Sequence, residues 1–181
     1  MSRAAGGLSL AERCAAIELL VLDVDGVMTD GSIHVDDNGV ETKVFHVRDG
    51  AGIAYWKRLG KRVAIISGRS CRAVDHRAAE LGIDRLYQGR LDKRPVLEEV
   101  LRLENLSAHQ ACVMGDDLAD IPALKMAGLA VTVADAVAEV KAVVDHVTQR
   151  SGGCGAVREV IGWLLQAQGR WTEVTKRYEG S

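Results

Sequence analysis

Two carboxylates stand two residues apart at the end of an apolar run, in Asp23-Val24-Asp25-Gly26. The run, residues 17–22, is hydrophobic apart from one glutamate, and Gly26 lets the backbone turn sharply after it. Both acids can therefore face one site, with one as nucleophile and the other as acid for a leaving oxygen, which is what phosphoryl transfer requires. The competing interpretation is a polar turn after a strand, since Asp and Gly are common turn residues.

A second acidic motif is Gly115-Asp116-Asp117-Leu118-Ala119-Asp120. Three carboxylates this close repel one another unless a cation lies among them, and hard oxygen ligands suit Mg²⁺. Capping of a helix that begins near Leu118 accounts for Asp116 or Asp117, but it does not account for all three acids. The motif thus predicts a magnesium site.

Ser67 and Lys93 are weaker signals when each is taken alone. Ser67-Gly68-Arg69 follows the apolar run 63–66 and is either an ordinary turn or a phosphate-binding one. Lys93 follows a loop, and most lysines are merely solvated. Their place in the chain adds weight, because Asp23, Ser67 and Asp116 each come at the end of a hydrophobic run and would meet at one edge of a sheet.

The apolar runs 17–22, 63–66 and 111–114 are typical of strands that are buried on both faces of a parallel sheet. Helical patterns separate and follow them. We expect helices at 10–16 with a Ser9/Glu12 capping box, at 50–59 with Asp49 as N-cap, and at 71–81, 94–103, 119–127, 136–144 and 156–168. This alternation predicts a single α/β domain over 1–181, with a doubly wound, mostly parallel sheet.

Residues 32–47 interrupt the alternation. The segments 32–35 and 40–47 flank Asp36-Asp37-Asn38-Gly39, and Asn-Gly is a strong hairpin signal. The hairpin and one helix fill the interval between Asp23 and Ser67, so no room remains there for a cap domain. We expect residues 1–8 to be a loose N-terminus and residues 170–181 a C-terminal tail.

Taken in order, the DxDG, Ser, Lys and GDDxxD motifs resemble those of the haloacid dehalogenase superfamily. The resemblance implies hydrolysis of a phosphomonoester through a phosphorylated Asp23, with Asp25 as general acid and then general base. It implies that Ser67 hydrogen-bonds a phosphoryl oxygen and that Lys93 neutralises the phosphoryl group and orients Asp23.

The same resemblance implies Mg²⁺ as cofactor. Asp23, Asp116 and the backbone carbonyl of Asp25 would hold the ion. Asp117 and Asp120 would act behind them, through water or by positioning the lysine.

The segments DVDGVMTDG, FHVRDGAGI, GDDLAD and GGCGAVREV resemble the cap-less branch that includes 3-deoxy-D-manno-octulosonate 8-phosphate phosphatase. The branch implies a small acidic sugar phosphate as substrate, in lipopolysaccharide biosynthesis. It also implies a homotetramer that assembles through the hairpin 32–47, with a neighbouring subunit closing each site. The residues that would line the substrate are His46, Val47, Arg48, Asp49, Gly50, Arg69 and Arg77.

Two positions depart from that branch, and two alternatives stay open. Ala54 and Cys154 stand where the octulosonate enzymes often have arginine, so a nonulosonate 9-phosphate of the sialic-acid type is the alternative substrate. A receiver-like phosphoryl switch is the non-enzymatic alternative, because it shares an acidic cluster, a Ser or Thr and a Lys. Asp25, and the position of GDDxxD after Lys93, favour turnover over a stable phosphoryl state.

The composition is that of a soluble globular protein, with 48% hydrophobic and 27% charged residues. A net charge of −2 does not favour binding to nucleic acid, so placed cations and a metal must hold an anionic substrate. The longest apolar stretch is too short to span a bilayer. The four cysteines are scattered singly, which indicates reduced thiols and a cytoplasmic protein.

Overall fold

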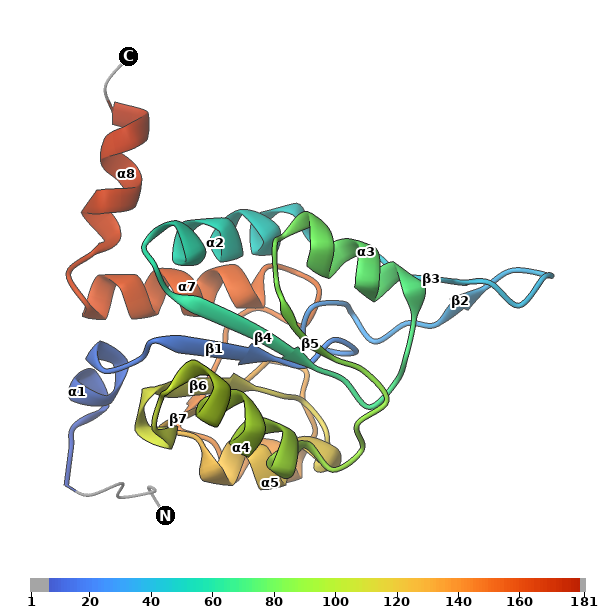
Figure 1. Ribbon diagram of the computed structural model, residues 1–181, viewed down its shortest axis with the longest axis horizontal. Coiled ribbons are helices and arrows are strands. Elements are labelled where there is room, and N and C mark those ends of the chain that lie inside the picture. Colours follow the sequence, from blue (N-terminus) through green and yellow to red (C-terminus); the bar gives the residue numbers. More distant parts are fainter. Residues whose placement is uncertain (1–6, 180–181) are drawn as a thin grey trace.

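A six-stranded parallel sheet forms the centre of the computed structural model, which describes residues 7–179 (Figure 1). The strand order is β5-β4-β1-β6-β7-β8, and every neighbouring pair is parallel. The strands are β1 (Leu19–Leu22), β4 (Arg62–Ile66), β5 (Arg85–Tyr87), β6 (Ala111–Met114), β7 (Leu129–Thr132) and β8 (His146–Val147). The predicted doubly wound α/β class is confirmed. The loose N-terminus expected at 1–8 falls almost wholly outside the described residues.

Helices cover both faces of the sheet (Figure 1). One face carries α2 (Val47–Arg58), α3 (Arg72–Glu80) and α7 (Ala156–Ala167). The other carries α4 (Lys93–Glu104), α5 (Ile121–Met126) and α6 (Ala138–Lys141). The remaining helices are α1 (Leu10–Ala15), α8 (Trp171–Glu179) and the short 3₁₀ turns Ala108–Gln110 and Leu118–Asp120.

Alternate residues of each central strand enter different cores. In β1, Leu20 and Leu22 join the cluster around Trp56 of α2, whereas Leu19 and Val21 join the cluster around the helices of the opposite face. Successive side chains of a strand point to opposite faces, so a strand covered on both faces must be apolar throughout. This is why the three hydrophobic runs carry no polar alternation.

The start of α2 corrects a sequence-based prediction. The helix begins at Val47, three residues earlier than expected, and its N-cap is His46, whose Nδ1 accepts a hydrogen bond from the N–H of Arg48 at 3.2 Å. Asp49 lies in the first turn and points elsewhere: its Oδ1 accepts the N–H of Arg158, in the first turn of α7, at 2.7 Å. The expected Asp49 cap was wrong because this carboxylate serves a different helix.

Several other boundaries also differ from expectation. Residues 119–127 form a 3₁₀ turn followed by the short α5, and only 138–141 of the expected 136–144 are helical. Strands β7 and β8 had no counterpart in the prediction, and the two residues of β8 are too few to carry a pattern. The capping box of α1 is present, with Ser9 and Glu12 bonding each other's backbone N–H groups.

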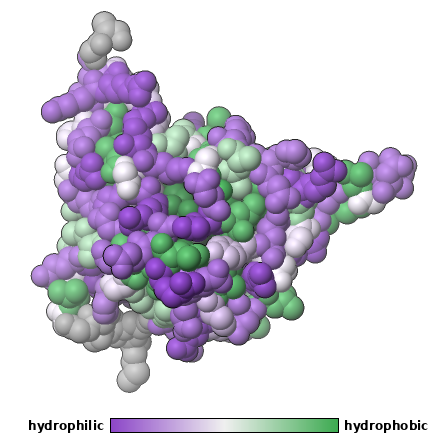
Figure 2. All heavy atoms as spheres, in the orientation of Figure 1, coloured by the Kyte–Doolittle hydropathy of each residue, from purple (hydrophilic) through white to green (hydrophobic). Residues whose placement is uncertain are grey.

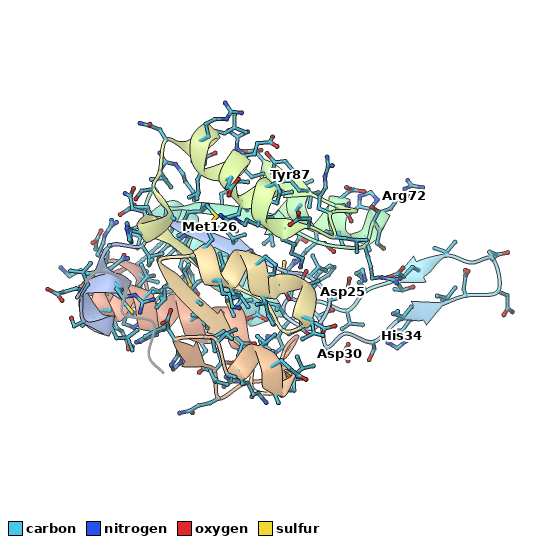
Figure 3. The ribbon with its side chains drawn as sticks, turned by 90° about the horizontal axis from the view of Figure 1, so that it is seen from below. Asp25, Asp30, His34, Arg72, Tyr87 and Met126 are labelled. Atoms are coloured by element: carbon cyan, nitrogen blue, oxygen red, sulfur yellow. The ribbon has the colours of Figure 1, made fainter. Side chains whose placement is uncertain are left out.

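The hairpin protrudes from the body at the edge where β1 ends, and its paired part is short (Figures 1 and 3). Only β2 (His34–Val35) and β3 (Glu41–Thr42) pair, in an antiparallel register. The expected strand 40–47 is therefore shorter than predicted, since β3 ends at Thr42 and residue 47 already begins α2. In Figure 2, hydrophobic side chains are exposed among hydrophilic ones along this protrusion. The apolar residues of the hairpin that are 55–65% exposed are Ile33, Val35, Val40 and Val44.

Residues 171–179 of the expected C-terminal tail are helical. Trp171 of α8 meets Tyr55 of α2 edge to face, with ring centroids 6.4 Å apart, and the Arg158 guanidinium lies 4.6 Å from the Trp171 ring. Val174 is buried against the body. Of the helices in residues 7–179, none has the length and hydrophobicity needed to cross a bilayer.

Candidate active site

The loops that follow β1, β4 and β6 surround a pocket of about 170 Å³. Parallel strands present their carboxyl ends at one edge, so residues far apart in the chain meet there. Its walls are made by Asp23, Asp25, Ser67, Gly68, Arg69, Lys93, Asp116, Asp117, Ala119 and Asp120. The structure thus brings together the catalytic and metal-binding candidates of all four motifs.

Asp23 and Lys93 form the buried centre of this pocket. Asp23 is 7% exposed, and its Oδ1 accepts a hydrogen bond from Lys93 Nζ at 2.5 Å. Burial raises the pKa of Asp23 to about 7, against the opposing effect of the Lys93 charge. Burial also lowers the pKa of Lys93, but Asp23 and Asp120 outweigh it and leave that pKa raised. Lys93 is the first residue of α4, and the Asp92 cap of that helix fixes its place.

Asp120 positions Lys93 and orders the loop after β6. Its Oδ1 accepts Lys93 Nζ at 2.5 Å, while its Oδ2 accepts the N–H groups of Asp116 at 2.9 Å and Asp117 at 3.2 Å. Asp117 caps the 3₁₀ turn through the N–H of Leu118, at 2.7 Å. Both oxygens of Asp120 are therefore already engaged, which suits a residue that orients others.

The Asp116 carboxylate lies against the turn of the first motif. A Cβ at Gly26, whose φ is +89°, would collide with this carboxylate, so glycine is required there both for conformation and for space. Burial, followed by the charges of Asp23, Asp120 and Asp117, raises the pKa of Asp116 to about 7. A cation that binds among such carboxylates reduces their mutual repulsion and favours their ionised forms.

The donor set fits a hard divalent cation. One oxygen from each of Asp23, Asp116 and Asp120 lies within 4.8 Å of the other two. Because Asp120 is occupied by Lys93 and by backbone N–H groups, Asp23 and Asp116 remain as the carboxylates for direct contact. Oxygen ligands of this kind are those that Mg²⁺ prefers.

Ser67 is buried at the end of β4. Its own N–H donates to Tyr87 O of β5 at 2.9 Å, which fixes its backbone, and its Oγ accepts the N–H of Arg69 at 3.3 Å. The hydroxyl can therefore still donate a proton to an anion in the pocket.

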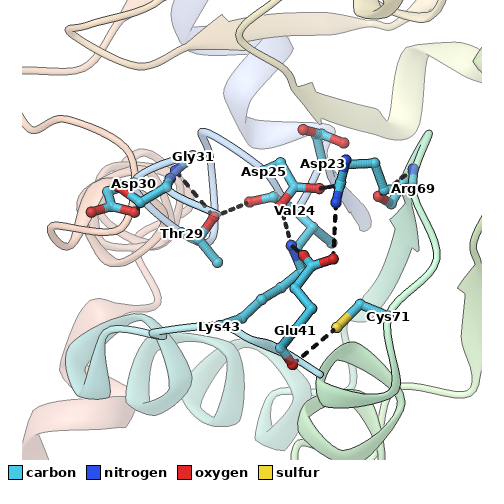
Figure 4. Close-up of polar contacts among 12 residues, drawn as sticks. Asp23, Val24, Asp25, Thr29, Asp30, Gly31, Glu41, Lys43, Arg69 and Cys71 are labelled. Atoms are coloured by element: carbon cyan, nitrogen blue, oxygen red, sulfur yellow. Dashed lines mark hydrogen bonds and ion pairs between the residues drawn. The ribbon is translucent and has the colours of Figure 1, made fainter. Parts of the chain in front are cut away.

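Sequence reasoning missed two residues that contact side chains in the pocket wall. Lys43 forms an ion pair with the Asp25 carboxylate, and its Nζ lies 2.7 Å from Glu41 Oε1 (Figure 4). Glu41 Oε2 in turn accepts Arg69 at 2.8 Å. The available signal was the alternation in β3 and the residue after it, which places Glu41 and Lys43 on the same face of the strand.

The remaining substrate-binding candidates do not reach this pocket within one chain. Val47 is exposed, and His46 and Asp49 bond helix termini as described above. Arg77 lies beside Gly50 with its guanidinium 5.6 Å from the Phe45 ring, and it pairs with a glutamate of its own helix.

Arg48 lines a larger cavity, of about 450 Å³, between α2 and α7. Arg150, Arg158 and Trp163 also line it, and the cavity contains none of the acidic motifs. Size alone would favour this cavity, but the nucleophile, acid and metal candidates line the smaller pocket.

Known proteins are similar to this chain over most of its length. The family model described as haloacid dehalogenase-like hydrolase matches residues 85–161. The 3-deoxy-D-manno-octulosonate 8-phosphate phosphatase KdsC of Escherichia coli (strain K12) is 45% identical over 157 residues, which is 87% of this chain and 84% of that protein.

Two solved structures agree. That of the same-named phosphatase from Moraxella catarrhalis, in complex with magnesium ion, phosphate ion and KDO, is 38% identical with a TM-score of 0.91, covering 93% of this chain and 97% of its own. A cobalt-bound form of the Haemophilus influenzae phosphatase is 41% identical with a TM-score of 0.86, covering 88% and 94%. The chain therefore belongs to the haloacid dehalogenase-like hydrolases, in the family of the 3-deoxy-D-manno-octulosonate 8-phosphate phosphatases.

Proposed function

We propose that the protein is a Mg²⁺-dependent phosphatase that transfers a phosphoryl group from a sugar-acid phosphate to Asp23 and then to water. The observation that carries this proposal is the buried Asp23 carboxylate, held by Lys93 at 2.5 Å, in a pocket that Asp25 and Asp116 also line. A receiver-like switch has no need of an acid beside the nucleophile.

The residues account for both halves of the reaction. A carboxylate oxygen of Asp23 attacks phosphorus, and the bond to the leaving oxygen breaks as Asp25 gives that oxygen a proton. Asp25 then takes a proton from water, which attacks the phosphorylated Asp23 and releases inorganic phosphate. Ser67 and Lys93 bind the phosphoryl oxygens during both steps.

Asp23, Asp116 and the backbone carbonyl of Asp25 would hold the Mg²⁺ ion. When bound, the ion neutralises charge on the phosphoryl oxygens. It would also offset the repulsion between the Asp23 and Asp116 carboxylates. Burial and neighbouring negative charges raise the pKa values of both groups.

The substrate proposed is 3-deoxy-D-manno-octulosonate 8-phosphate. Support comes from the relatives that carry this substrate in their names and cover most of this chain. It also comes from the similar structure that contains magnesium ion, phosphate ion and KDO. Ala54 and Cys154, where we noted departures from the octulosonate pattern, do not line the pocket.

We also propose that the protein works as a homotetramer in the cytoplasm. A pocket of about 170 Å³ is below the range of about 300–1,000 Å³ for small-molecule sites, so an eight-carbon sugar phosphate needs further walls. The exposed apolar side chains of the hairpin need a partner, and a neighbouring subunit provides both. Free thiols at Cys14, Cys71, Cys112 and Cys154 favour a reducing compartment.

Phosphate release from a panel of substrates tests the function. The panel holds octulosonate 8-phosphate, N-acetylneuraminate 9-phosphate and glucose 6-phosphate, each with Mg²⁺ and with chelator. We expect the highest kcat/KM on the octulosonate ester, and no turnover with chelator or in Asp23→Asn, while Lys125→Met on the exposed side of α5 behaves as the parent. Faster phosphate release from N-acetylneuraminate 9-phosphate would refute the proposed substrate and leave the proposed mechanism standing. Turnover by Asp23→Asn would refute the mechanism.

A further inference from the structure

The carboxylate of Asp25 and three other charged side chains form a ring (Figure 4). Lys43 pairs with Asp25 Oδ1, and Arg69 Nε lies 3.9 Å from Asp25 Oδ2. Glu41 closes the ring, because Oε1 lies 2.7 Å from Lys43 and Oε2 lies 2.8 Å from Arg69. Each oxygen of Asp25 thus faces its own cation, and one glutamate bridges the two cations.

The two bridging residues come from the hairpin. Most of residues 30–44 are exposed, but the Lys43 side chain is only 1% exposed and that of Glu41 is 17% exposed. Figure 3 places Asp25 where the hairpin meets the body. At the base of the hairpin, the charged side chains of Lys43 and Glu41 therefore point toward the body, and Lys43 contacts the proposed general acid Asp25.

Stability alone is a poor reason for this arrangement. Removing a lysine and a glutamate from water costs free energy that their attraction often does not return, and apolar replacements of buried ion pairs are often neutral or stabilising. Orientation is a better reason, since a bond from Lys43 to one oxygen and the Arg69 charge 3.9 Å from the other favour one orientation of the Asp25 carboxylate.

Given the phosphatase function proposed above, we propose that Lys43 and Glu41 are positioning residues that orient the Asp25 carboxylate for proton transfer to the leaving oxygen. Lys43 holds one oxygen of Asp25, and the other oxygen faces Arg69 in the wall of the pocket. Glu41 fixes the Lys43 ammonium and the Arg69 guanidinium relative to each other. The hairpin thereby becomes part of the catalytic machinery of its own subunit.

The leaving group supplies the sharpest test. An alkyl oxygen must receive a proton as it departs, whereas p-nitrophenolate leaves without one, so only the former needs a well-oriented Asp25. The variant Lys43→Met keeps the aliphatic stem and removes the ammonium, Lys43→Arg keeps the charge, and Glu41→Gln removes one bridge. Lys125→Met, on the exposed side of α5, is the matched control.

Single-turnover transfer to Asp23 is measured with octulosonate 8-phosphate and with p-nitrophenyl phosphate. For Lys43→Met we expect the rate to fall about 10²-fold on the sugar ester and less than about tenfold on the aryl ester, with KM and the Mg²⁺ requirement within about twofold. Lys43→Arg should recover part of the loss, and Glu41→Gln should show a smaller loss with the same preference.

Three outcomes would overturn the inference. They are equal losses on the two esters, a change confined to KM, and rates like those of Lys125→Met. A lower melting temperature of Lys43→Met with unchanged rates per folded molecule would likewise contradict it, because the ring would then only hold the hairpin against the body. If the parent protein hydrolyses neither ester, the proposed function itself fails, and that result is distinct from a normal parent with an unaffected Lys43→Met.

Discussion

Asp36 and Asp23 carry the same carboxyl group, yet the fold shifts their pKa values in opposite directions. In the exposed hairpin turn, the N–H of Val40 holds the pKa of Asp36 below its usual value. At the end of β1, burial raises the pKa of Asp23 to about 7 despite the charge of Lys93. After β6, burial and the neighbouring acids raise the pKa of Asp116 to about 7. Desolvation and like charges disfavour ionised carboxylates, so a cation bound between Asp23 and Asp116 stabilises their ionised forms.

These shifts predict that Mg²⁺ stabilises the folded protein more as the pH rises. A carboxyl group with a raised folded pKa contributes stability below its unfolded pKa, and that contribution is lost as the pH rises through the folded value of about 7. Mg²⁺ binds the ionised form and must displace protons at lower pH. We therefore expect a fixed Mg²⁺ concentration to raise Tm more at about pH 8 than at about pH 5.5, measured by differential scanning fluorimetry.

Two variants separate the site from general salt effects. Asp116→Asn should lose most of the Mg²⁺-induced rise in Tm at both pH values, while Asp37→Asn should keep it. An equal rise at the two pH values, or a full rise in Asp116→Asn, would show that the cation acts elsewhere.

At the scale of elements, α2 and α7 are joined where both begin. Asp49 in the first turn of α2 accepts the N–H of Arg158 in the first turn of α7, which satisfies a donor that α7 cannot satisfy itself. The helices also approach closely there, because a Cβ at Gly52 would lie 3.2 Å from the Arg158 Cα. This contact ties the start of α2 to the start of α7.

We expect Asp49→Ala to lower the free energy of unfolding by about 1–2 kcal/mol, because it leaves the partly buried N–H of Arg158 without this acceptor. Asp49→Asn should cost less, since the amide oxygen still accepts and burial already raises the pKa of Asp49, which disfavours its charged form. Urea unfolding measures both, with Asp37→Ala as the exposed control. Equal stability of Asp49→Ala and the parent would mean that the bond contributes nothing.

At the scale of the whole molecule, one chain supplies the phosphoryl chemistry but few contacts for a sugar. Arg69 faces the pocket, whereas Arg48 and Arg77 lie elsewhere on the same chain. A hairpin with only two short paired strands is marginally stable alone, and its unpaired edges and apolar side chains favour association with copies of itself.

We therefore expect a homotetramer in solution, which light scattering on the purified protein measures directly. Replacing Val35 and Val40 together by aspartate should dissociate it and lower kcat/KM on the sugar ester, because the additional walls of the site are lost. Replacing Leu103 of α4, which is exposed away from the hairpin, by aspartate should do neither. A fully active monomer of the parent protein would refute the proposed assembly.

Local patterns in the sequence determined the central strands, most of the helices and the haloacid dehalogenase motifs. The runs that became β1, β4 and β6 are apolar because both faces of the sheet are covered, and turn residues such as Gly26 are demanded by local geometry. Such constraints act within a few residues, so the chain records them directly.

Only the tertiary structure decided the contacts between distant segments. Lys43 reaches Asp25 across 18 positions and Asp49 reaches Arg158 across 109, and neither residue type announces its partner. The raised pKa values of Asp23 and Asp116 likewise depend on burial, which the sequence does not state residue by residue. Packing sets these distances and the local dielectric, and the same carboxylate can therefore be a turn cap, a helix cap or a nucleophile.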